Sequence, residues 1–397
     1  MLDVLKKSLL RLLSPEQLPP AALSEQRLDR ERGLLSVDPG CWPVIEACTD
    51  WLVQAQDNSR SADGGVARDF SLVKGWASSY PETTGYIIPT FIAMARRRDH
   101  NLHQRARRML DWCVHIQYPE GGFQGGKIDG LPRVPVTFNT GQILLGLAAG
   151  VAEYGDSAYR EAMLRAASWL RDSQDADGCW RRFPTPFAAP GDKVYETHVS
   201  WGLFEAERLA PGRGFGDAGL RQVAWALSKQ QSNGWFASNC LSNPMLPLTH
   251  TIGYALRGVI EAYRLSGQAG LLVASRLTSD SLCQAITADG HLAGRLDKDF
   301  SPAADWVCLT GTVQIAHCLL LLHQITGESR YLDAGRRANG FVRRTVKVGG
   351  PVETRGGVKG SLPVDGDYGR WEYLNWAAKF CIDAQLLETD LESPRAA

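Results

Sequence analysis

The chain has 397 residues, of which 44% are hydrophobic and 22% charged, a composition typical of globular proteins and long enough for two average domains or one large toroid. Its 43 basic and 43 acidic residues balance, which argues against bulk electrostatic attraction to nucleic acid or to anionic membranes. No apolar run is long enough to span a bilayer.

The nine cysteines are scattered, and no C-x-x-C pair occurs among them. Because the cysteines are odd in number and scattered, we predict reduced, mostly buried thiols rather than a disulfide framework or a zinc site. We therefore expect a cytoplasmic protein, and the sequence indicates neither a cofactor nor a metal ion.

Residues 1–40 are predicted to form an N-terminal extension. The segment MLDVLKKSLLRLL at its start is not typical of a secretion signal, because lysines and an arginine break its apolar run and no small-residue cleavage site follows. We predict a short amphipathic helix that packs on the body of the protein. A weak contact of residues 1–14 with a membrane or a partner complex is the alternative.

Six glycine turns then recur at intervals of 56 or 57 residues, with a last interval of 67, which is the signature of a repeat architecture. They contain Gly65, Gly122, Gly178, Gly234, Gly290 and Gly357. A helix-like segment precedes each turn and often ends in glutamine. These first-kind segments are residues 51–56, 109–117, 166–174, 223–231, 277–284 and 336–344.

A second helix-like segment follows each turn after a longer loop, with apolar residues three or four positions apart. These second-kind segments are residues 83–95, 138–150, 195–206, 249–260, 309–320 and 372–384. They are rich in glycine and alanine near their starts, as close packing around a crowded centre requires.

Twelve alternating helices predict an all-α fold, an (α/α)6 toroid of six helical hairpins over residues 41–390, with a tail at 391–397. Six inner helices would form a ring inside six outer helices. The first outer helix, about 43–56, and the last inner helix, about 372–388, would pair and close the ring. An open solenoid is the alternative, but it would need distinct polar caps.

The connections between these helices are unequal. Inner-to-outer links are short, whereas outer-to-inner loops are long and carry aromatic and charged residues, which is where binding sites usually lie on a rigid scaffold. The same end of the toroid holds the starts of all six inner helices, whose free N–H groups favour an anionic ligand. We predict that SSYPETTGYIIPT, residues 78–90, faces this mouth.

The mouth is predicted to gather aromatic, amide, carboxylate and imidazole side chains. The candidates are Arg68, Trp76, Tyr80, Glu82, Asn139, Tyr195, Glu196, His198, Asn239, His250, Asp305, Trp306, Asp367, Arg370, Tyr373 and Asn375. Flat aromatic faces beside directed hydrogen-bonding groups suit sugar rings. Structural explanations compete: tryptophans pack between repeats, threonines cap helices, and Glu82 would be favoured by a helix dipole.

Two resemblances support the toroid. The segment ASWLRDSQDADGCW (167–180) resembles the Gln/Trp repeat of squalene and other triterpene cyclases, through Gln174, Gly178 and Trp180. Those cyclases protonate with a D-x-D-D motif, which this chain lacks, and the zinc ligands of the related protein prenyltransferases cannot be assembled here. This resemblance therefore implies the fold without the chemistry.

The second resemblance is to D-glucuronyl C5-epimerases. SYPETTGYIIPTF (79–91) and GRWEYLNWAAKF (369–380) are similar to two segments that supply active-site residues in that family. The resemblance implies roles for Tyr80 and Glu82, then Arg370 and Tyr373, although the family's acidic residue precedes the Tyr-Pro, where this chain has serine. The repeat also looks like a large bacterial family associated with exopolysaccharide synthesis and, distantly, like six-hairpin glycosidases.

The leading hypothesis is an enzyme that acts on a uronic-acid-containing glycan by C5-epimerase or lyase chemistry. Tyr80, Glu82, His198, His250 and Tyr373 are the catalytic candidates, and the other mouth residues would bind the substrate. Both reactions begin by removing the proton next to a carboxylate, so the sequence does not separate them.

Three alternatives stay open. A glycoside hydrolase needs two converging carboxylates, for which the candidates are Glu82, Glu196, Asp305, Asp365 and Asp367. A non-catalytic glycan-binding scaffold needs none, and a terpenoid cyclase-like enzyme would need an apolar cavity. An oligo- or polysaccharide is the expected partner; the sequence does not reveal the oligomeric state.

Overall fold

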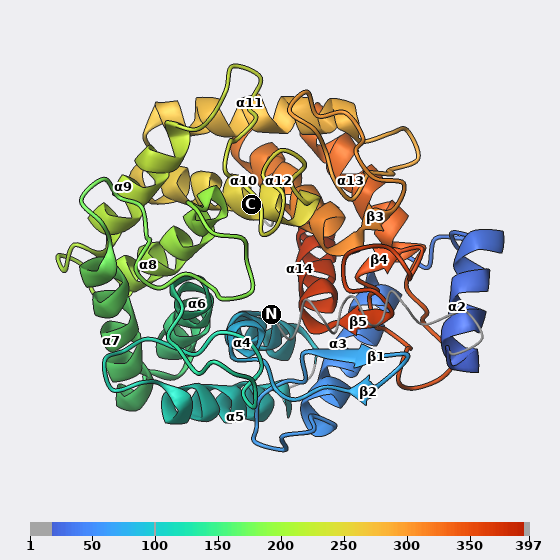
Figure 1. Cartoon of the computed structure of the whole chain (residues 1–397), viewed down its shortest axis with the longest axis horizontal. Coiled ribbons are helices and arrows are strands. Elements are labelled where there is room, and N and C mark those ends of the chain that lie inside the picture. The colour runs from blue at the N-terminus through green and yellow to red at the C-terminus, as the bar shows by residue number, and fades with distance from the viewer. Residues whose placement is uncertain (1–17, 99–100, 393–397) are drawn as a thin grey trace.

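The computed structural model describes residues 18–98 and 101–392, and it is an (α/α)6 toroid (Figure 1). The inner ring consists of α4 (Pro81–Arg97), α6 (Thr137–Tyr154), α8 (Thr197–Leu209), α10 (Thr249–Ser266), α12 (Leu309–Thr326) and α14 (Asn375–Glu392). The outer ring consists of α3 (Cys41–Asp57), α5 (Asn101–Ile116), α7 (Ser157–Ser173), α9 (Phe215–Leu227), α11 (Ala269–Ala285) and α13 (Ser329–Arg343). The predicted fold is confirmed.

The ring closes as the repeat predicts. Helix α14 packs against α3 and α12 and also contacts α4, so the last inner helix joins both the first outer and the first inner helix. A three-stranded antiparallel sheet adds a second closure, in the order β2 (Gly75–Trp76), β1 (Asp69–Ser71), β5 (Glu372–Leu374). It joins the first and last long loops, and Phe70 pairs with Tyr373. A two-stranded sheet pairs β3 (Val307–Cys308) with β4 (Ser361–Leu362).

Glutamines at the ends of outer helices tie neighbouring repeats together. Gln174 Nε2 donates to the carbonyl oxygen of Gly178 in its own turn at 3.0 Å and to that of Ala218 in the next outer helix at 2.8 Å. Gln117 makes the same pair of bonds to Gly121 and Ala162. The recurring glutamine therefore satisfies buried carbonyl groups where two repeats meet.

Each turn glycine lies against the backbone of the next outer helix. Gly178 has φ +94°, and a Cβ there would lie 2.6 Å from the carbonyl oxygen of Arg221. In three turns the left-handed glycine is the residue before the predicted one, at Gly64, Gly121 and Gly356. The turns thus need glycine both for the left-handed backbone and for the close approach.

Inner helices also approach one another at glycines, as the small residues near their starts predict. A Cβ at Gly202 in α8 would lie 2.6 Å from the carbonyl oxygen of Gly141 in α6, and one at Gly141 would lie 2.8 Å from Val199 Cα. Gly146 abuts the carbonyl of Gly85 in α4 in the same way. These contacts bring the first turns of neighbouring inner helices together.

The N-terminal extension contains a helix that the sequence analysis did not predict, α2 (Pro20–Glu31). It docks through charged side chains: Lys359 Nζ lies 3.2 Å from Glu25 Oε1 and also pairs with Asp29, and Arg30 pairs with Asp365 at 2.7 Å. The predicted amphipathic helix at 1–14 and its membrane or partner contact lie outside the described residues. So does most of the predicted tail, since α14 runs to Glu392.

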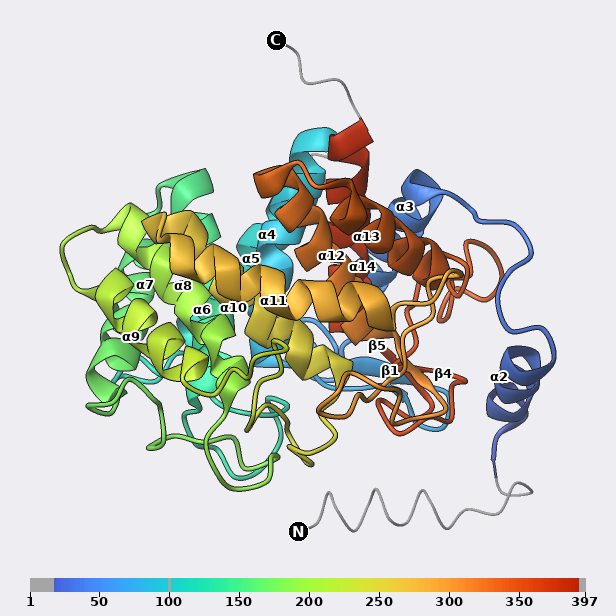
Figure 2. The ribbon, with the colours of Figure 1, turned by 90° about the horizontal axis from the view of Figure 1, so that it is seen from above.

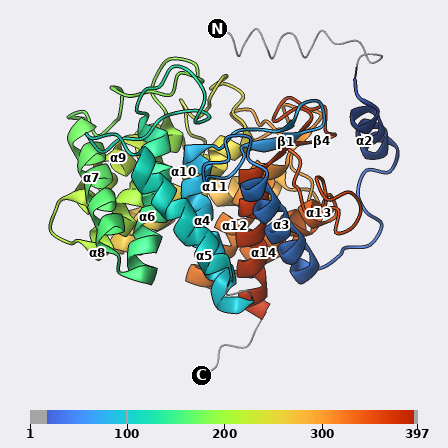
Figure 3. The ribbon, with the colours of Figure 1, turned by 90° about the horizontal axis from the view of Figure 1, so that it is seen from below.

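Among the described residues, no helix is both long enough and apolar enough to cross a membrane. Seen edge-on, the long outer-to-inner loops gather on one side of the two rings (Figures 2 and 3). The toroid therefore has one decorated end, at the starts of the inner helices, and one end with short links.

We predict that Gly178→Ala lowers the free energy of unfolding by about 1–3 kcal/mol more than Gly267→Ala does. Both glycines have positive φ, so both variants carry the backbone cost of about 1–2 kcal/mol. A Cβ at Gly267 meets nothing within 4 Å, whereas one at Gly178 meets the next outer helix. Urea unfolding of both variants measures the difference; equal losses would contradict the proposed role of this close contact.

Candidate functional site

The candidate site lies at the starts of the inner helices and is centred on Glu82. This residue stands in the first turn of α4, directly after Pro81, and its side chain is partly exposed. Asn139 Nδ2, at the start of α6, donates to Glu82 Oε2 at 3.0 Å, and the Tyr80 hydroxyl acts electrostatically on the same carboxylate. Two neighbouring inner helices and the loop before them thus converge on one carboxyl group.

The carboxyl group of Glu82 holds a proton unusually tightly. Burial raises its pKa to about 8, and the Arg68 charge and the Tyr80 hydroxyl offset only part of that effect. Burial and the charge of Glu82 also raise the pKa of Tyr80, so its phenol stays protonated. At neutral pH this pair therefore presents two groups that can donate a proton.

Arg68 supplies the nearby positive charge. Its Nη1 donates to Glu372 Oε2 in β5 at 2.9 Å and also pairs with Asp69, and its guanidinium lies 5.1 Å from the centre of the Trp376 ring. The centre of that ring is 6.1 Å from the centre of the Tyr80 ring. Arg68 is therefore held against an aromatic wall, and its electrostatic interactions include both Glu82 and Glu372.

Two histidines meet around one tyrosine. The ring centres of His198 in α8 and His250 in α10 each lie 4.5 Å from the ring centre of Tyr254. Each Nδ1 is hydrogen-bonded to a glutamine carbonyl oxygen, Gln142 Oε1 at 2.6 Å for His198 and Gln314 Oε1 at 2.8 Å for His250. Because a carbonyl only accepts, each Nδ1 carries the proton and each Nε2 keeps its lone pair.

Both imidazoles are neutral at physiological pH. Burial lowers the pKa of His250 to about 4, and burial, with the nearby charges of Arg257 and Lys379, lowers that of His198 well below its usual value. Burial thus raises the pKa of Glu82 and lowers those of the histidines, since in each case it disfavours the charged form. The cluster combines neutral bases with a protonated acid.

Deeper along the axis lies a second charged group. Lys379 Nζ in α14 lies 4.4 Å from the centre of the Phe380 ring and pairs with Asp383 at 2.6 Å. Arg257 stacks over the Trp201 ring at 4.0 Å and pairs with the fully buried Glu261 at 2.7 Å. These cations act electrostatically on His198 and add to the effect of burial, which is the main reason that its pKa is lowered.

Two further predicted residues flank the cluster. The Tyr195 ring lies edge-on to Phe138 at 5.2 Å and interacts electrostatically with both Glu82 and Glu196. Burial raises the pKa of Glu196 to about 8, and its charged neighbours are Lys193, Asp192 and Arg181 rather than Glu82. One carboxyl oxygen of Glu196 is buried without a hydrogen-bond partner among the described residues.

Tyr373 does not join the group around Glu82. Side chains alternate along a strand, so Glu372 reaches Arg68 while Tyr373 points to the opposite face of β5. There its hydroxyl faces Glu25 and Asp29 of α2. The structure thus brings Glu372, which sequence reasoning missed, rather than Tyr373 into contact with Arg68.

Both predicted tryptophans pack within the protein. Trp306 is buried, and a Cβ at Gly294 would touch its ring. The centre of the Trp76 ring lies 5.3 Å from that of Trp51 and 5.2 Å from that of Phe70. Trp76 nevertheless stays partly exposed, and Trp376 at the start of α14 lies beside Arg68 and Tyr80.

Asn375 lies beside the start of α4, and the other remaining candidates make separate contacts. The Asn375 amide donates to Ala67 O at 2.9 Å and Thr83 Oγ1 at 2.8 Å, which fixes the start of α14 beside that of α4. Asn239 is buried, and its backbone carbonyl accepts from a threonine of α10. Asp305 and Asp367 are exposed, and the Arg370 guanidinium lies 5.9 Å from the Trp371 ring.

Sequence reasoning missed the residues one turn inside the inner helices. Tyr254 follows His250 by four positions, and Tyr86 follows Glu82 by four, so each lies on the same helix face. The Tyr86 and Tyr254 hydroxyls face each other across the axis. Helical periodicity counted from the first-turn residues could have found both.

Comparison with known proteins shows the fold alone. No protein-family model matches the chain, and no curated protein matches it in sequence. Among solved structures it is similar to cellobiose 2-epimerase from Spirochaeta thermophila, with a TM-score of 0.70 and 16% identity over 94% of this chain and 100% of the other.

Two unsaturated glucuronyl hydrolases are similar as well. The enzyme specific for heparin has a TM-score of 0.69 and 14% identity over 88% of this chain and 96% of its own. The enzyme from Bacillus sp. GL1, responsible for the degradation of glycosaminoglycan, has a TM-score of 0.68 and 14% identity over 86% and 96%. At such identities the likeness establishes a shared (α/α)6 toroid.

We predict that Glu82→Gln becomes more stable relative to the parent protein as pH rises from about 5 to about 8. The folded-state pKa of Glu82 is raised above its unfolded value of 4.5, so the native state holds an extra proton in this range. That stabilisation is complete below pH 4.5 and is lost as pH rises through 8; glutamine, which does not titrate, avoids the loss.

Chemical denaturation of both proteins across this pH range measures the effect. Glu46→Gln, which changes an exposed carboxylate on α3, is the control and should track the parent. A stability difference between Glu82→Gln and parent that does not change with pH would contradict the raised pKa.

Proposed function

We propose that this protein is an enzyme that acts on an oligo- or polysaccharide by proton transfer at the group around Glu82. The supporting observation is that one cluster at the mouth holds a partly exposed carboxyl group with a pKa of about 8 and two buried, neutral imidazoles with Nε2 lone pairs. Such a set can both donate and accept protons near neutral pH. The similar solved structures are hydrolases and epimerases of sugars, which agrees with this proposal.

For the reaction, we propose removal of the C5 proton of a uronate unit, with epimerisation or elimination to follow. The Nε2 of His198 or His250 would take the proton, and the Glu82 carboxyl or the Tyr80 phenol would return one or protonate the leaving oxygen. Arg68 and the free N–H groups at the helix starts would stabilise the negative charge that develops on the carboxylate.

A glycoside hydrolase is the second candidate. Glu82, protonated at neutral pH, suits a general acid, and the glucuronyl hydrolases among the similar structures favour this alternative. Of the carboxylates, Glu372 is the best candidate for the second catalytic group, because Arg68 pairs with it and also acts electrostatically on Glu82. A terpenoid cyclase is disfavoured, because charged and polar groups line the axis.

We predict that incubation in D2O with uronic-acid oligosaccharides places deuterium at C5, and that Glu82→Gln lowers the rate of incorporation by about 10²–10⁴-fold. NMR reads deuterium at C5, ultraviolet absorbance reads an unsaturated product, and a reducing-end assay reads hydrolysis. Deuterium without absorbance identifies an epimerase, and absorbance identifies a lyase.

Glu46→Gln serves as the matched carboxylate control and should retain the parent's rate, with circular dichroism confirming the fold of both variants. New reducing ends without deuterium at C5 would replace the leading reaction with hydrolysis. Silence in all three assays across the panel would refute the proposed enzymatic function.

A further inference from the structure

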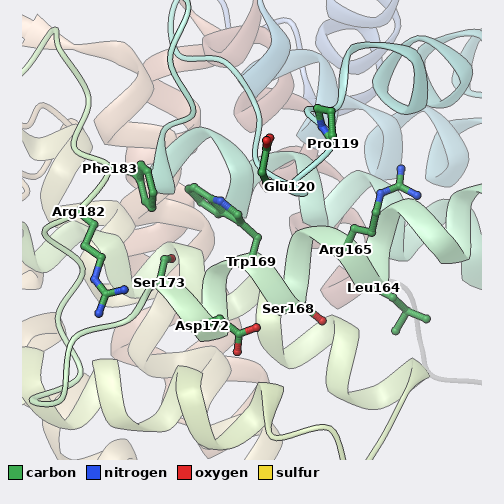
Figure 4. A pocket seen from close by; sticks show the side chains of 10 residues that line it. All are labelled: Pro119, Glu120, Leu164, Arg165, Ser168, Trp169, Asp172, Ser173, Arg182 and Phe183. Carbon is green, nitrogen blue, oxygen red and sulfur yellow. The ribbon is translucent and has the colours of Figure 1, made fainter.

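A pocket on the outer wall of the toroid lies apart from the Glu82 group. It has a volume of about 470 Å³ and lies between α7, the turn after α5 and the loop after α7 (Figure 4). Trp169 lies at its centre, with Phe183 on one side and Glu120 on the neighbouring turn. Arg165 and Arg182 lie on opposite sides of the two rings.

The two aromatic rings form an open platform. The ring centres of Trp169 and Phe183 are 4.7 Å apart and tilted by 39°, and both side chains are partly exposed. The Trp169 indole N–H donates to no acceptor in the part of the chain that the structure describes. Trp180, in the same repeat, donates instead to Leu170 O at 2.8 Å. Trp169 therefore keeps an apolar face and a free donor for a ligand.

The rim provides hydrogen-bonding groups of both kinds. Arg165 and Arg182 donate, Glu120 and Asp172 accept, and the Ser168 hydroxyl does either. The two charge signs balance, so the pocket suits a hydroxyl-rich ligand better than a densely anionic one. An apolar ring face with a few convergent polar groups is the usual composition of a small-molecule site.

A second pocket, in the corresponding groove one repeat earlier, allows the Trp169 pocket to be compared with its equivalent in the repeat. It has a volume of about 480 Å³ and lies beside Trp112, Arg108 and His115. There Trp112 is only 5% exposed, and no phenylalanine faces it. The groove is thus a product of the repeat, whereas the exposed pair of rings is a property of the Trp169 pocket.

The Trp169 pocket is also joined to the mouth of the toroid. The Phe183 carbonyl oxygen accepts from the N–H of Thr137 at 2.9 Å, at the first residue of α6. Asn139, two residues further on, donates to Glu82. Residues 137–139, at the start of α6, therefore contact both the wall of the pocket and the candidate catalytic carboxyl group.

We propose that the Trp169 pocket is a second, non-catalytic carbohydrate-binding site that holds pyranose units of the polymeric substrate outside the ring. This inference rests on the proposed function, because it assumes a glycan longer than the central site accommodates. A sugar ring stacks its C–H face on Trp169 and Phe183, while its hydroxyls bond to the charged rim. Binding a remote part of the chain raises its effective concentration at the central site.

The test is affinity electrophoresis through gels that contain alginate, hyaluronan or a soluble cellulose derivative. The parent protein is expected to be retarded by at least one polymer. Phe183→Ala, which removes one ring, and Ser168→Phe, which fills the pocket and keeps both rings, should each weaken the apparent affinity about tenfold. His115→Ala in the second pocket is the matched control and should be retarded like the parent.

This proposal would be overturned if both Trp169-pocket variants were retarded like the parent, or if His115→Ala weakened the apparent affinity equally. It would also be overturned if no gel retarded the parent protein. The Glu82→Gln variant distinguishes this binding-site proposal from the proposed enzymatic function, since it should lose turnover and keep its retardation in the gel. If the parent turns over no substrate but its retardation depends on Phe183 and Ser168, the binding site stands while the proposed enzymatic function fails.

Discussion

The close approach of neighbouring inner helices at glycine is the constraint on which the site depends. Where a Cβ at Gly146 of α6 would collide with the carbonyl of Gly85 in α4, the two helices are held at backbone contact rather than at side-chain distance. Glycine costs about 0.5–1 kcal/mol relative to alanine within a helix, so these positions are retained for the approach they permit. The first turns of the inner helices then lie close enough for side chains from different helices to bond directly, as Asn139 does with Glu82.

Burial inside that narrow ring sets the protonation of the whole cluster. A carboxyl group with one amide donor and one phenol, beside a guanidinium already bonded to Glu372, is not compensated fully for its lost hydration, so its neutral form is favoured. His198 and His250 respond to the same burial by losing their protons. Burial is therefore the single cause that keeps the carboxyl group of Glu82 protonated and the two imidazoles neutral. This protonation pattern does not depend on a strong ion pair at Glu82.

The repeat made the fold predictable, because a period read along the whole chain fixes the number of hairpins and the pairing of α14 with α3. The sequence also predicted Glu82, Asn139, His198 and His250 as site residues, since first-turn residues of inner helices must face the mouth. Tyr254 was missed because candidate residues were taken only from the first turn of each inner helix. The placement of Tyr373 depends on a three-residue strand, and the docking of α2 depends on charges from distant loops; neither leaves a periodic signal in the sequence.

The docking of α2 bears on the site through that same strand. Lys359 is buried between Glu25 and Asp29, and it pairs across a β-bridge with Tyr373, whose ring lies on the α2 side of β5. A buried ionic cluster adds little net stability but fixes one arrangement, because any other leaves a charge unpaired. Glu372, on the opposite face of β5, then holds Arg68 in place. Helix α2 thus helps to fix the position of the positive charge beside Glu82, although its own contacts are with the loops that carry Lys359 and Asp365.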